Sequence, residues 1–324
     1  MKTLKRLLAT ALAVAVMLAI CLMGTACGGK KVIGVMQFGT HESLNNCYAG
    51  ILQGLEENGI DTNEYEIMFE NSNFDSDAAA SQARKFVNSG ADIIIGIATP
   101  CAMQAAIASN GEIPVVYCAV TDGAVMSSFQ NVCGSSDRPN YVKTLELVTA
   151  MMEKEDLKIG VISHTSEDSD KVMIDELNAA AKAYAGMEIN VKYISEISTI
   201  GTVTESLIQE GVDCFVNLLD NTVVGQLATI LEKTNEYNIP VFGSEVEQVV
   251  SGCVASASID YIEIGRIAGE MAAKIVLGQD TAANLGNKII SDPTLYYNPD
   301  VATKLGVNVP TALLNLISTK DYNK

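Results

Sequence analysis

Short apolar runs alternate along the chain with stretches whose apolar residues recur at helical spacing. The apolar runs contain few polar residues, which is typical of strands buried on both faces of a sheet. The first half contains predicted strands at 32–36, 65–69, 93–97 and 115–117 and predicted helices at 44–55 and 77–87. The second half contains predicted strands at 158–162, 189–194, 214–217 and 240–242 and predicted helices at 171–184, 202–210 and 223–236. This alternation predicts an α/β protein with two doubly wound Rossmann-like lobes, each built on a parallel sheet.

The connection between the two lobes is expected near residues 135–140. One more helix, 261–277, follows the second sheet and is expected to pack back on the first lobe, so that the chain crosses between the lobes several times. The N-terminal lobe is predicted to comprise residues 32–135 and 258–295, and the C-terminal lobe residues 136–257 and 296–324.

Residues 1–26 have the layout of an export signal. A basic start precedes an apolar run over 7–23, and small residues lead into Cys27. A cysteine directly after small residues resembles the bacterial lipobox, in which the thiol is lipidated and becomes the first residue of the mature chain. We therefore expect a lipoprotein signal peptide at 1–26, lipidation of Cys27, a short tether at 27–31, and an extracytoplasmic protein anchored to the cell membrane. An uncleaved anchor or a plain secretory signal is the alternative, and it leads to the same compartment.

Composition narrows the class of partner. The 324 residues suffice for two domains of about 150 residues each. The formal net charge of -18 argues against nucleic acid, whose phosphates require a basic face, and against binding to anionic lipid. We therefore expect no nucleic-acid partner, whereas the charge says nothing about the small-molecule ligand that is expected on other grounds.

The cysteines give no indication of a metal or redox site. None of those after Cys27 forms a Cys-x-x-Cys pair, so the usual zinc and thioredoxin spacings are absent. Cys118 and Cys214 lie inside predicted strands and resemble small buried hydrophobes. Free buried thiols are the preferred interpretation, one disulfide is the alternative, and no cofactor or metal is expected.

Polar residues follow the carboxyl ends of predicted strands, where ligands bind in open parallel sheets. After strand 93–97, Ala98 leads to Thr99, a predicted helix N-cap, with Pro100 in the first turn. The exposed amides of this turn would form an anion site suited to a carboxylate. Alternatively, Thr99 serves only as a cap.

The second half repeats this arrangement. Asp220, Asn221 and Thr222 open a helix after strand 214–217. The two helix starts, one in each lobe, would face each other across a cleft. Asp220 or Asn221 could also serve only as a cap.

An amino-acid ligand would bring an ammonium group that needs an anionic oxygen. The candidates at strand ends are Asp122, Asp220 and Glu245. Thr121 directly precedes Asp122 and is included in the predicted site. Asp122 is preferred because it ends the strand next along from Thr99 in the same lobe. A turn residue is the alternative for Asp122, and a surface glutamate is the alternative for Glu245.

Two residues near the end of the first strand complete the predicted site. Gln37 is expected to line the cleft rather than to be buried away from it. His41 is also included, although a loop histidine is solvated by default.

Five segments in order along the chain resemble one family. They are 33–38 (Ile-Gly-Val-Met-Gln-Phe), 97–100 (Ile-Ala-Thr-Pro), 119–122 (Ala-Val-Thr-Asp), 220–224 (Asp-Asn-Thr-Val-Val) and 259–266 (Ile-Asp-Tyr-x-x-Ile-Gly-Arg). Together they resemble the tryptophan/tyrosine-type ABC transporter substrate-binding proteins, a branch of the type I periplasmic-binding fold. The resemblance covers nearly the whole chain from about residue 31.

The resemblance implies two lobes joined by three crossovers, with the ligand at their interface. It also implies an ABC permease and its ATPase as partners. We expect a monomeric solute-binding lipoprotein whose ligand is an aromatic or other apolar L-amino acid. A lipoprotein that senses its ligand and signals to a membrane receptor, and a binder of a sugar or nucleoside, are the alternatives.

The sequence gives little support to an enzyme. It has no Gly-x-Ser-x-Gly, no Gly-x-Gly-x-x-Gly, no phosphate loop and no His-Glu-x-x-His. A hydrolase that pairs Asp122 with Glu245 is the enzymatic alternative, and an export signal with a lipobox argues against it. No catalytic residue is therefore predicted.

Overall fold

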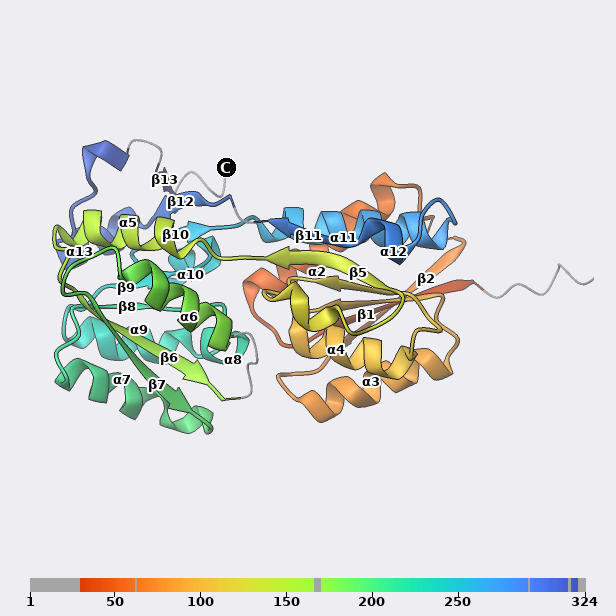
Figure 1. The fold of residues 1–324 in the computed structure, drawn as a ribbon, viewed down its shortest axis with the longest axis horizontal. Coiled ribbons are helices and arrows are strands. Elements are labelled where there is room, and N and C mark those ends of the chain that lie inside the picture. Colours follow the sequence, from red (N-terminus) through yellow and green to blue (C-terminus); the bar gives the residue numbers. More distant parts are fainter. Residues whose placement is uncertain (1–29, 62, 166–169, 291, 314–315, 320–324) are drawn as a thin grey trace, which may run out of the picture.

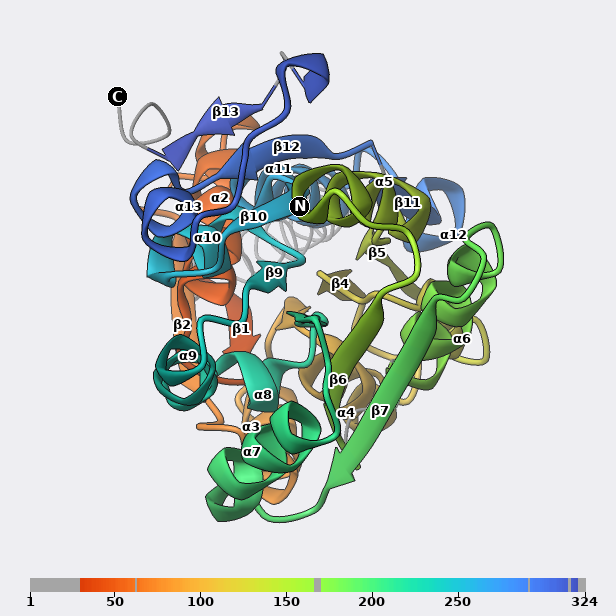
Figure 2. The same ribbon diagram turned by 90° about the vertical axis from the view of Figure 1, so that its left-hand side faces the viewer.

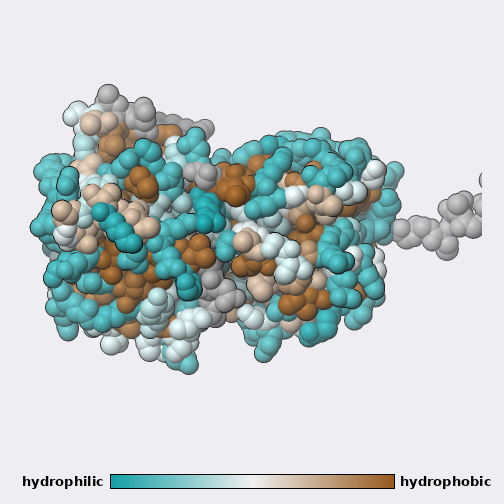
Figure 3. All heavy atoms as spheres, viewed as in Figure 1, coloured by the Kyte–Doolittle hydropathy of each residue, from teal (hydrophilic) through white to brown (hydrophobic). Residues whose placement is uncertain are grey.

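The computed structural model of the protein describes residues 30–319 except 62, 166–169, 291 and 314–315. The predicted signal peptide and Cys27 lie outside the described residues. Two α/β lobes follow one another along the long axis (Figure 1), and the space-filling view shows them as rounded bodies joined at a narrower waist (Figure 3). Within the described ranges, none of the helices is both long and apolar enough to span a bilayer.

The N-terminal lobe is built on a sheet of order β11-β5-β4-β3-β1-β2, in which each neighbouring pair is parallel. Its strands are β1 (Lys31–Gln37), β2 (Tyr65–Asn71), β3 (Ile93–Ile97), β4 (Val115–Cys118), β5 (Val132–Asp137) and β11 (Asn287–Ile290). Its helices are α2 (Glu42–Glu57), α3 (Ser76–Asn88), α4 (Thr99–Ser109), η1 (Gly123–Met126), α11 (Tyr261–Val276) and α12 (Ala282–Leu285). Strands β3 and β4 are buried along their whole length because helices cover both faces of the sheet.

The C-terminal lobe is built on a sheet of order β13-β12-β10-β9-β8-β6-β7. Its strands are β6 (Lys158–His164), β7 (Glu188–Ile194), β8 (Cys214–Val216), β9 (Val241–Gly243), β10 (Ala255–Ser258), β12 (Thr294–Tyr297) and β13 (Ile317–Ser318). Its helices are α5 (Tyr141–Met152), α6 (Asp170–Ala181), η2 (Ile197–Thr199), α7 (Ile200–Gln209), α8 (Asn221–Val224), α9 (Leu227–Glu236), α10 (Val246–Ser251), α13 (Pro299–Leu305) and η3 (Thr311–Leu313). Figure 2 shows α7, α8 and α9 on one side of this sheet and α5 and α6 on the other.

The prediction of two doubly wound α/β lobes is confirmed, with two local differences. Strand β12 runs antiparallel to β10, because the chain reaches it from the other lobe and not through a helix of its own lobe. The single helix predicted at 223–236 is two helices, α8 and α9, separated at Gly225 and Gln226.

The chain passes between the lobes three times in the described topology, between β5 and α5, between β10 and α11, and between β11 and β12. The predicted return of helix 261–277 to the first lobe is confirmed, since α11 packs along α2. Glycines allow this close approach. A Cβ atom at Gly50 of α2 or at Gly265 of α11 would lie 2.0 or 2.1 Å from a carbonyl oxygen of the facing helix. The interface therefore excludes any larger residue at these positions.

Strand β5 is absent from the sequence prediction, which treats residues 135–140 as a connection. Its second half, Gly-Ser-Ser-Asp, is polar but buried. Ser135 Oγ donates to the carbonyl oxygen of Ile264 over 3.1 Å, and Ser136 Oγ donates to Asn287 Oδ1 over 3.0 Å. These long-range partners satisfy polar groups that an apolar pattern cannot reveal.

Candidate ligand-binding site

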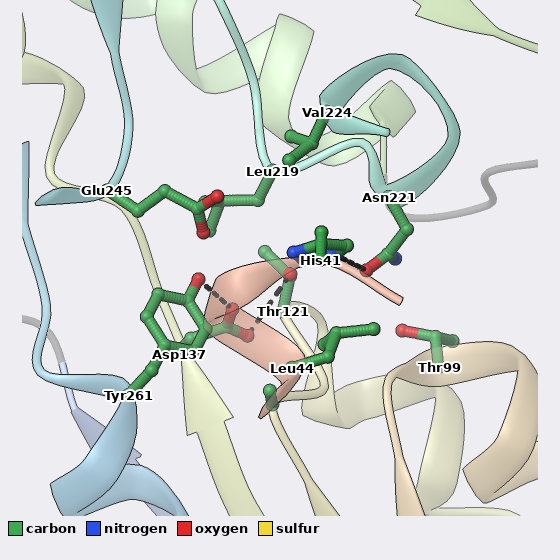
Figure 4. A pocket seen from close by; sticks show the side chains of 11 residues that line it. His41, Leu44, Thr99, Thr121, Asp137, Leu219, Asn221, Val224, Glu245 and Tyr261 are labelled. Atoms are coloured by element: carbon green, nitrogen blue, oxygen red, sulfur yellow. Dashed lines mark hydrogen bonds between the residues drawn. The ribbon is translucent and has the colours of Figure 1, made fainter. Parts of the chain in front are cut away.

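A small cavity lies between the two lobes, at the carboxyl ends of parallel strands (Figure 4). It is lined by His41, Leu44, Thr99, Ala119, Thr121, Asp137 and Tyr261 from the N-terminal lobe and by Leu219, Asn221, Val224 and Glu245 from the C-terminal lobe. The cavity volume is about 10 Å³, which leaves room for about one water molecule. A ligand of amino-acid size therefore requires the lobes or the lining side chains to move apart.

Asp137, the last residue of β5, is the centre of a buried hydrogen-bonded cluster. Thr121 Oγ1 donates to Asp137 Oδ1 over 3.2 Å, and Tyr261 Oη donates to Oδ2 over 2.7 Å. Burial raises the pKa of Asp137 to about 6, and the hydrogen bonds from Tyr261 and Thr121 oppose this rise. The group is therefore mostly ionised at neutral pH, and a carboxylate can accept a further hydrogen bond from a cation.

Glu245, the residue before α10, is a second buried carboxyl group, with an exposed fraction of 2%. Its Oε1 atom has no hydrogen-bond partner among the described residues. Burial, the charge of Glu247 and that of Asp137 all raise the pKa of Glu245, to about 8. A cation placed beside both carboxyl groups would favour their ionised forms and would supply the missing partner of Oε1.

His41 lies in the loop between β1 and α2 and reaches the other lobe. Its Nε2 atom is 3.2 Å from Asn221 Oδ1, and its Nδ1 atom is buried with no hydrogen-bond partner among the described residues. Burial lowers the pKa of His41 to about 4, although the hydrogen bond with Asn221 opposes this. The imidazole is therefore neutral at physiological pH.

Helix α4 begins at Thr99, and its N-cap residue is Ala98. The prediction of Thr99 as the N-cap is wrong by one residue, because the chain turns sharply at Ala98, which has φ 71° and ψ 157°. A non-glycine residue in this region is strained by roughly 1–3 kcal/mol, and such strain is common at functional sites. No side chain caps α4, so the amides of its first turn and the hydroxyl of Thr99, which lines the cavity, remain available to an anion.

Apolar side chains line the rest of the cavity. Leu44 comes from α2, Leu219 from the loop after β8, and Val224 from α8. Figure 4 places Leu219 and Val224 on the C-terminal side of the cavity and Leu44 on the opposite side. The site thus combines polar groups at its edges with an apolar middle, the usual composition of a small-molecule pocket.

Five of the predicted site residues line this cavity: His41, Thr99, Thr121, Asn221 and Glu245. The other predicted site residues do not line it, and they are Gln37, Ala98, Asp122, Asp220 and Thr222.

Asp122, the preferred partner for an ammonium group, is directed elsewhere. Its Oδ1 accepts a hydrogen bond from the amide of Ala124 and so caps η1, and it lies 3.8 Å from the guanidinium of Arg138. The structure therefore supports the turn interpretation of Asp122, because its carboxylate is already occupied by local donors.

Asp220 and Gln37 also have structural partners. Asp220 caps α8 by accepting hydrogen bonds from the amides of Thr222 and Val223, and it accepts a third from the amide of His164. Gln37 is 1% exposed and donates to the carbonyl oxygen of Gly39 over 2.7 Å. Gln37 is therefore buried beside the loop that carries His41, in contrast to the prediction that it lines the cleft.

The predicted site lacks Asp137 and Tyr261, which form a buried hydrogen bond at the cavity. Asp137 ends a strand that the polar sequence of β5 conceals. Tyr261 stands in the segment 259–266 that resembles the family, and its position one residue after the N-cap Asp260 was the available signal. The apolar lining residues and Ala119 are likewise absent from the predicted site, because nothing in sequence separates them from core residues.

Side chains from the two lobes meet outside the cavity as well. Asn46 Nδ2 of α2 donates to Glu247 Oε1 of α10 over 2.7 Å. Arg138, which follows β5, pairs with Glu176 of α6. With the contact between His41 and Asn221, these bonds hold the lobes together in the described conformation.

The described part of the chain contains no cluster of three or more His, Cys, Asp or Glu side chains able to hold a metal ion. Its cysteines are buried free thiols, and they are Cys47, Cys101, Cys118, Cys133, Cys214 and Cys253.

Comparison with known proteins identifies the family. The profile of the ABC transporter substrate binding protein family matches residues 32–320. The chain is also 36% identical over 258 residues to a tyrosine-binding protein from Clostridioides difficile (strain R20291), with 77% of this chain and 74% of that relative covered. The chain therefore belongs to the family of ABC transporter substrate-binding proteins, and the resemblance drawn from its motifs is confirmed.

Two solved structures of similar sequence identity differ in how well they superpose on this chain. A domain from Streptococcus pneumoniae in complex with L-Trp is 28% identical and has a TM-score of 0.83, with 89% of this chain and 100% of that chain covered. The ligand-free, open structure of a substrate-binding protein from Clostridium difficile is 29% identical but has a TM-score of 0.66, with 89% and 99% covered. At nearly equal identity, the arrangement of the lobes is thus more similar to that of the L-Trp complex than to that of the ligand-free, open structure.

Proposed function

We propose that this protein binds an aromatic L-amino acid in the cavity between its lobes and delivers it to an ABC permease. The observation that carries the proposal is the pairing of two buried carboxyl groups, Asp137 and Glu245, with the uncapped start of α4 at Thr99. A free amino acid carries a cation and an anion on one carbon atom, and this cavity offers a group of opposite charge to each. The tyrosine-binding relative and the complex with L-Trp support the aromatic class.

The ammonium group would lie beside Asp137 and Glu245. Asp137 is ionised at neutral pH and held in place by Thr121 and Tyr261. Glu245 has an oxygen that no described residue satisfies, and an ammonium donor would satisfy it. Charge-assisted hydrogen bonds of this kind contribute about 1.5–3 kcal/mol each.

The carboxylate would lie at the start of α4. The first-turn amides and the hydroxyl of Thr99 are donors, and the positive end of the helix dipole favours an anion. The aromatic side chain would then occupy the apolar part of the cavity, between Leu44 of one lobe and Leu219 and Val224 of the other.

Binding would be coupled to opening and closing of the lobes. The closed cavity is too small to admit an amino acid, so the ligand would enter an open form and the lobes would close on it. The three connections between the lobes are the natural hinge. Interlobe bonds such as Asn46 to Glu247 would form only on closure.

A thermal-shift panel tests the proposed ligand class. The proteinogenic L-amino acids, a hexose, a nucleoside and myo-inositol would be added in separate samples to the mature protein. A ligand at 100 times its dissociation constant stabilises the fold by about 2.7 kcal/mol. We expect stabilisation by tyrosine or tryptophan and none by the other classes. A response to the hexose or nucleoside alone would contradict the proposal.

We further propose that the mature protein is a monomer outside the cytoplasm, anchored by a lipid on Cys27. The Cys27→Ala variant should be poorly processed or released from membranes in fractionation. If the unmodified variant stayed membrane-bound after washing with high salt, the lipoprotein assignment would be wrong.

A further inference from the structure

His41 presents a hydrogen-bond acceptor to the cavity. A carboxamide oxygen can only accept, so the contact with Asn221 Oδ1 requires the ring proton of His41 to reside on Nε2. Because burial keeps the imidazole neutral, Nδ1 then carries a lone pair. Nδ1 is buried and has no hydrogen-bond partner among the described residues.

The surroundings of the ring leave this acceptor to a ligand. Phe74 lies parallel to the ring, with centroids 6.4 Å apart, and Leu44 and Val224 line the same cavity. None of these three side chains can donate a hydrogen bond, and the polar side chains that line the cavity, Glu245 included, make no hydrogen bond to Nδ1. A buried acceptor without a partner costs free energy that a donor on the ligand would recover.

The ends of the proposed ligand determine which of its groups reaches His41. In Figure 4 the two carboxyl groups of Asp137 and Glu245 lie on one side of the cavity, Thr99 and Asn221 lie on the other, and His41 lies between them. With the ammonium group at the carboxyl groups and the carboxylate at Thr99, the side chain of the amino acid would extend from its α-carbon into the apolar part of the cavity, which Leu44 and Val224 line together with His41.

We propose that His41 selects amino acids whose aromatic ring carries a hydrogen-bond donor, by accepting that bond at Nδ1. The inference rests on the proposed function and names a determinant of its specificity. Tyrosine has a phenolic O–H and tryptophan an indole N–H, whereas phenylalanine has neither. Such a donor is present both in tyrosine, for which one relative is named, and in tryptophan, which is bound in one of the similar solved structures. A site built to bond a donor discriminates strongly against the analogue that lacks it, because its own polar group is then left unpaired.

Calorimetry on the unaltered protein tests the inference with four ligands of nearly equal shape. Tyrosine and 4-aminophenylalanine keep a donor at the ring para position, and 4-fluorophenylalanine and phenylalanine lack one. We expect each of the two ligands without a donor to bind at least about tenfold more weakly than tyrosine, and 4-aminophenylalanine to bind within about fivefold of tyrosine.

A variant pair then assigns the selectivity to His41. In His41→Phe the preference for tyrosine over 4-fluorophenylalanine should fall to less than about threefold. Val224→Ala is the matched control, since it removes apolar lining and leaves the imidazole in place. It should weaken the binding of both ligands by the same factor and preserve the ratio of their affinities.

The outcomes separate this inference from the proposed function. If the unaltered protein bound tyrosine and 4-fluorophenylalanine equally, or if His41→Phe kept the preference, the role of His41 would be refuted while amino-acid binding stood. If no amino acid bound at all, the proposed function and this inference would both be refuted. The ligand series needs no variant, so it can still refute the role of His41 if His41→Phe fails to fold.

Discussion

The two lobes present carboxyl groups of different kinds to the cavity between them. Asp137 of the N-terminal lobe accepts hydrogen bonds from Thr121 and Tyr261 of the same lobe. Glu245 of the C-terminal lobe has an oxygen with no partner among the described residues and a pKa raised to about 8. Asp137 is thus preorganised before a ligand arrives, whereas the hydrogen bonding of Glu245 would be completed by one. Under the proposed function, the ligand would bind first to the N-terminal lobe and would then be enclosed by Glu245.

The largest effect is expected from Asp137→Asn. The change leaves the ligand ammonium without its ionised partner in a buried site, which is costly. We expect tyrosine affinity to fall at least about 100-fold, or about 2.7 kcal/mol, in calorimetry on the folded variant. Asp122→Asn is the matched control, because Asp122 caps η1 outside the cavity, and it should change affinity by less than about threefold. If the two variants behaved in the opposite way, Asp122 would be the ammonium partner.

A smaller effect is expected from Glu245→Gln, because the N-terminal lobe still holds the ligand. Affinity should fall about tenfold, or about 1.4 kcal/mol, and stopped-flow fluorescence should show the loss mainly as faster dissociation. Glu247→Gln is the control, since glutamine can still accept the hydrogen bond from Asn46. Equal losses of affinity in Asp137→Asn and Glu245→Gln would remove the distinction between the lobes.

The two carboxyl groups should also differ in how they affect stability with pH. A pKa of Glu245 raised to about 8 means that the folded protein keeps a proton that the unfolded chain has lost, so the free energy of unfolding should fall as pH rises towards 8. Asp137 acts in the same direction only up to a pH of about 6, and His41 acts in the opposite direction between about 4 and 6.5.

Glu245 therefore dominates among these three groups from pH 6.5 to 8. Over that interval we expect the free energy of unfolding of the ligand-free protein, measured by urea unfolding, to fall by about 1–2 kcal/mol. In Glu245→Gln it should fall by less than half as much. Equal slopes for the two proteins would show that Glu245 titrates near its ordinary pKa.

The smallest effect is expected from Tyr261→Phe, which removes one hydrogen bond to Asp137 and leaves the carboxylate in place. Tyrosine affinity should fall about threefold to tenfold, in line with about 0.5–1.5 kcal/mol for one hydrogen bond. Thr121→Val removes the other bond to Asp137 and should have a similar effect. A loss as large as that of Asp137→Asn would mean that Tyr261 contacts the ligand in its own right.

The sequence predicts the fold better than the site, for physical reasons. Apolar runs such as Ile93–Ile97 show the buried strands, and their alternation with amphipathic helices implies the doubly wound topology. Strand β5 is not predicted because its buried residues Ser135, Ser136 and Asp137 are polar and form hydrogen bonds with partners distant in sequence.

Local chemistry explains why some predicted site residues lie outside the cavity. Asp122 and Asp220 both follow strand ends, as ligand residues do, but each carboxylate turns back to cap a nearby helix. Thr99 and Glu245 reach the cavity because no local donor or acceptor engages them as a cap. Position at a strand end can be inferred from sequence, whereas the direction of the side chain depends on the three-dimensional arrangement of its partners.

A crystal structure of the mature protein grown with L-tyrosine would test the central claim most directly. We predict the amino acid between the lobes, with its ammonium nitrogen within about 3.2 Å of an oxygen of Asp137 and of Glu245 and its carboxylate at the start of α4. Ligand density outside the interlobe cavity, or an ammonium group bound at Asp122 instead of Asp137 and Glu245, would contradict the claim.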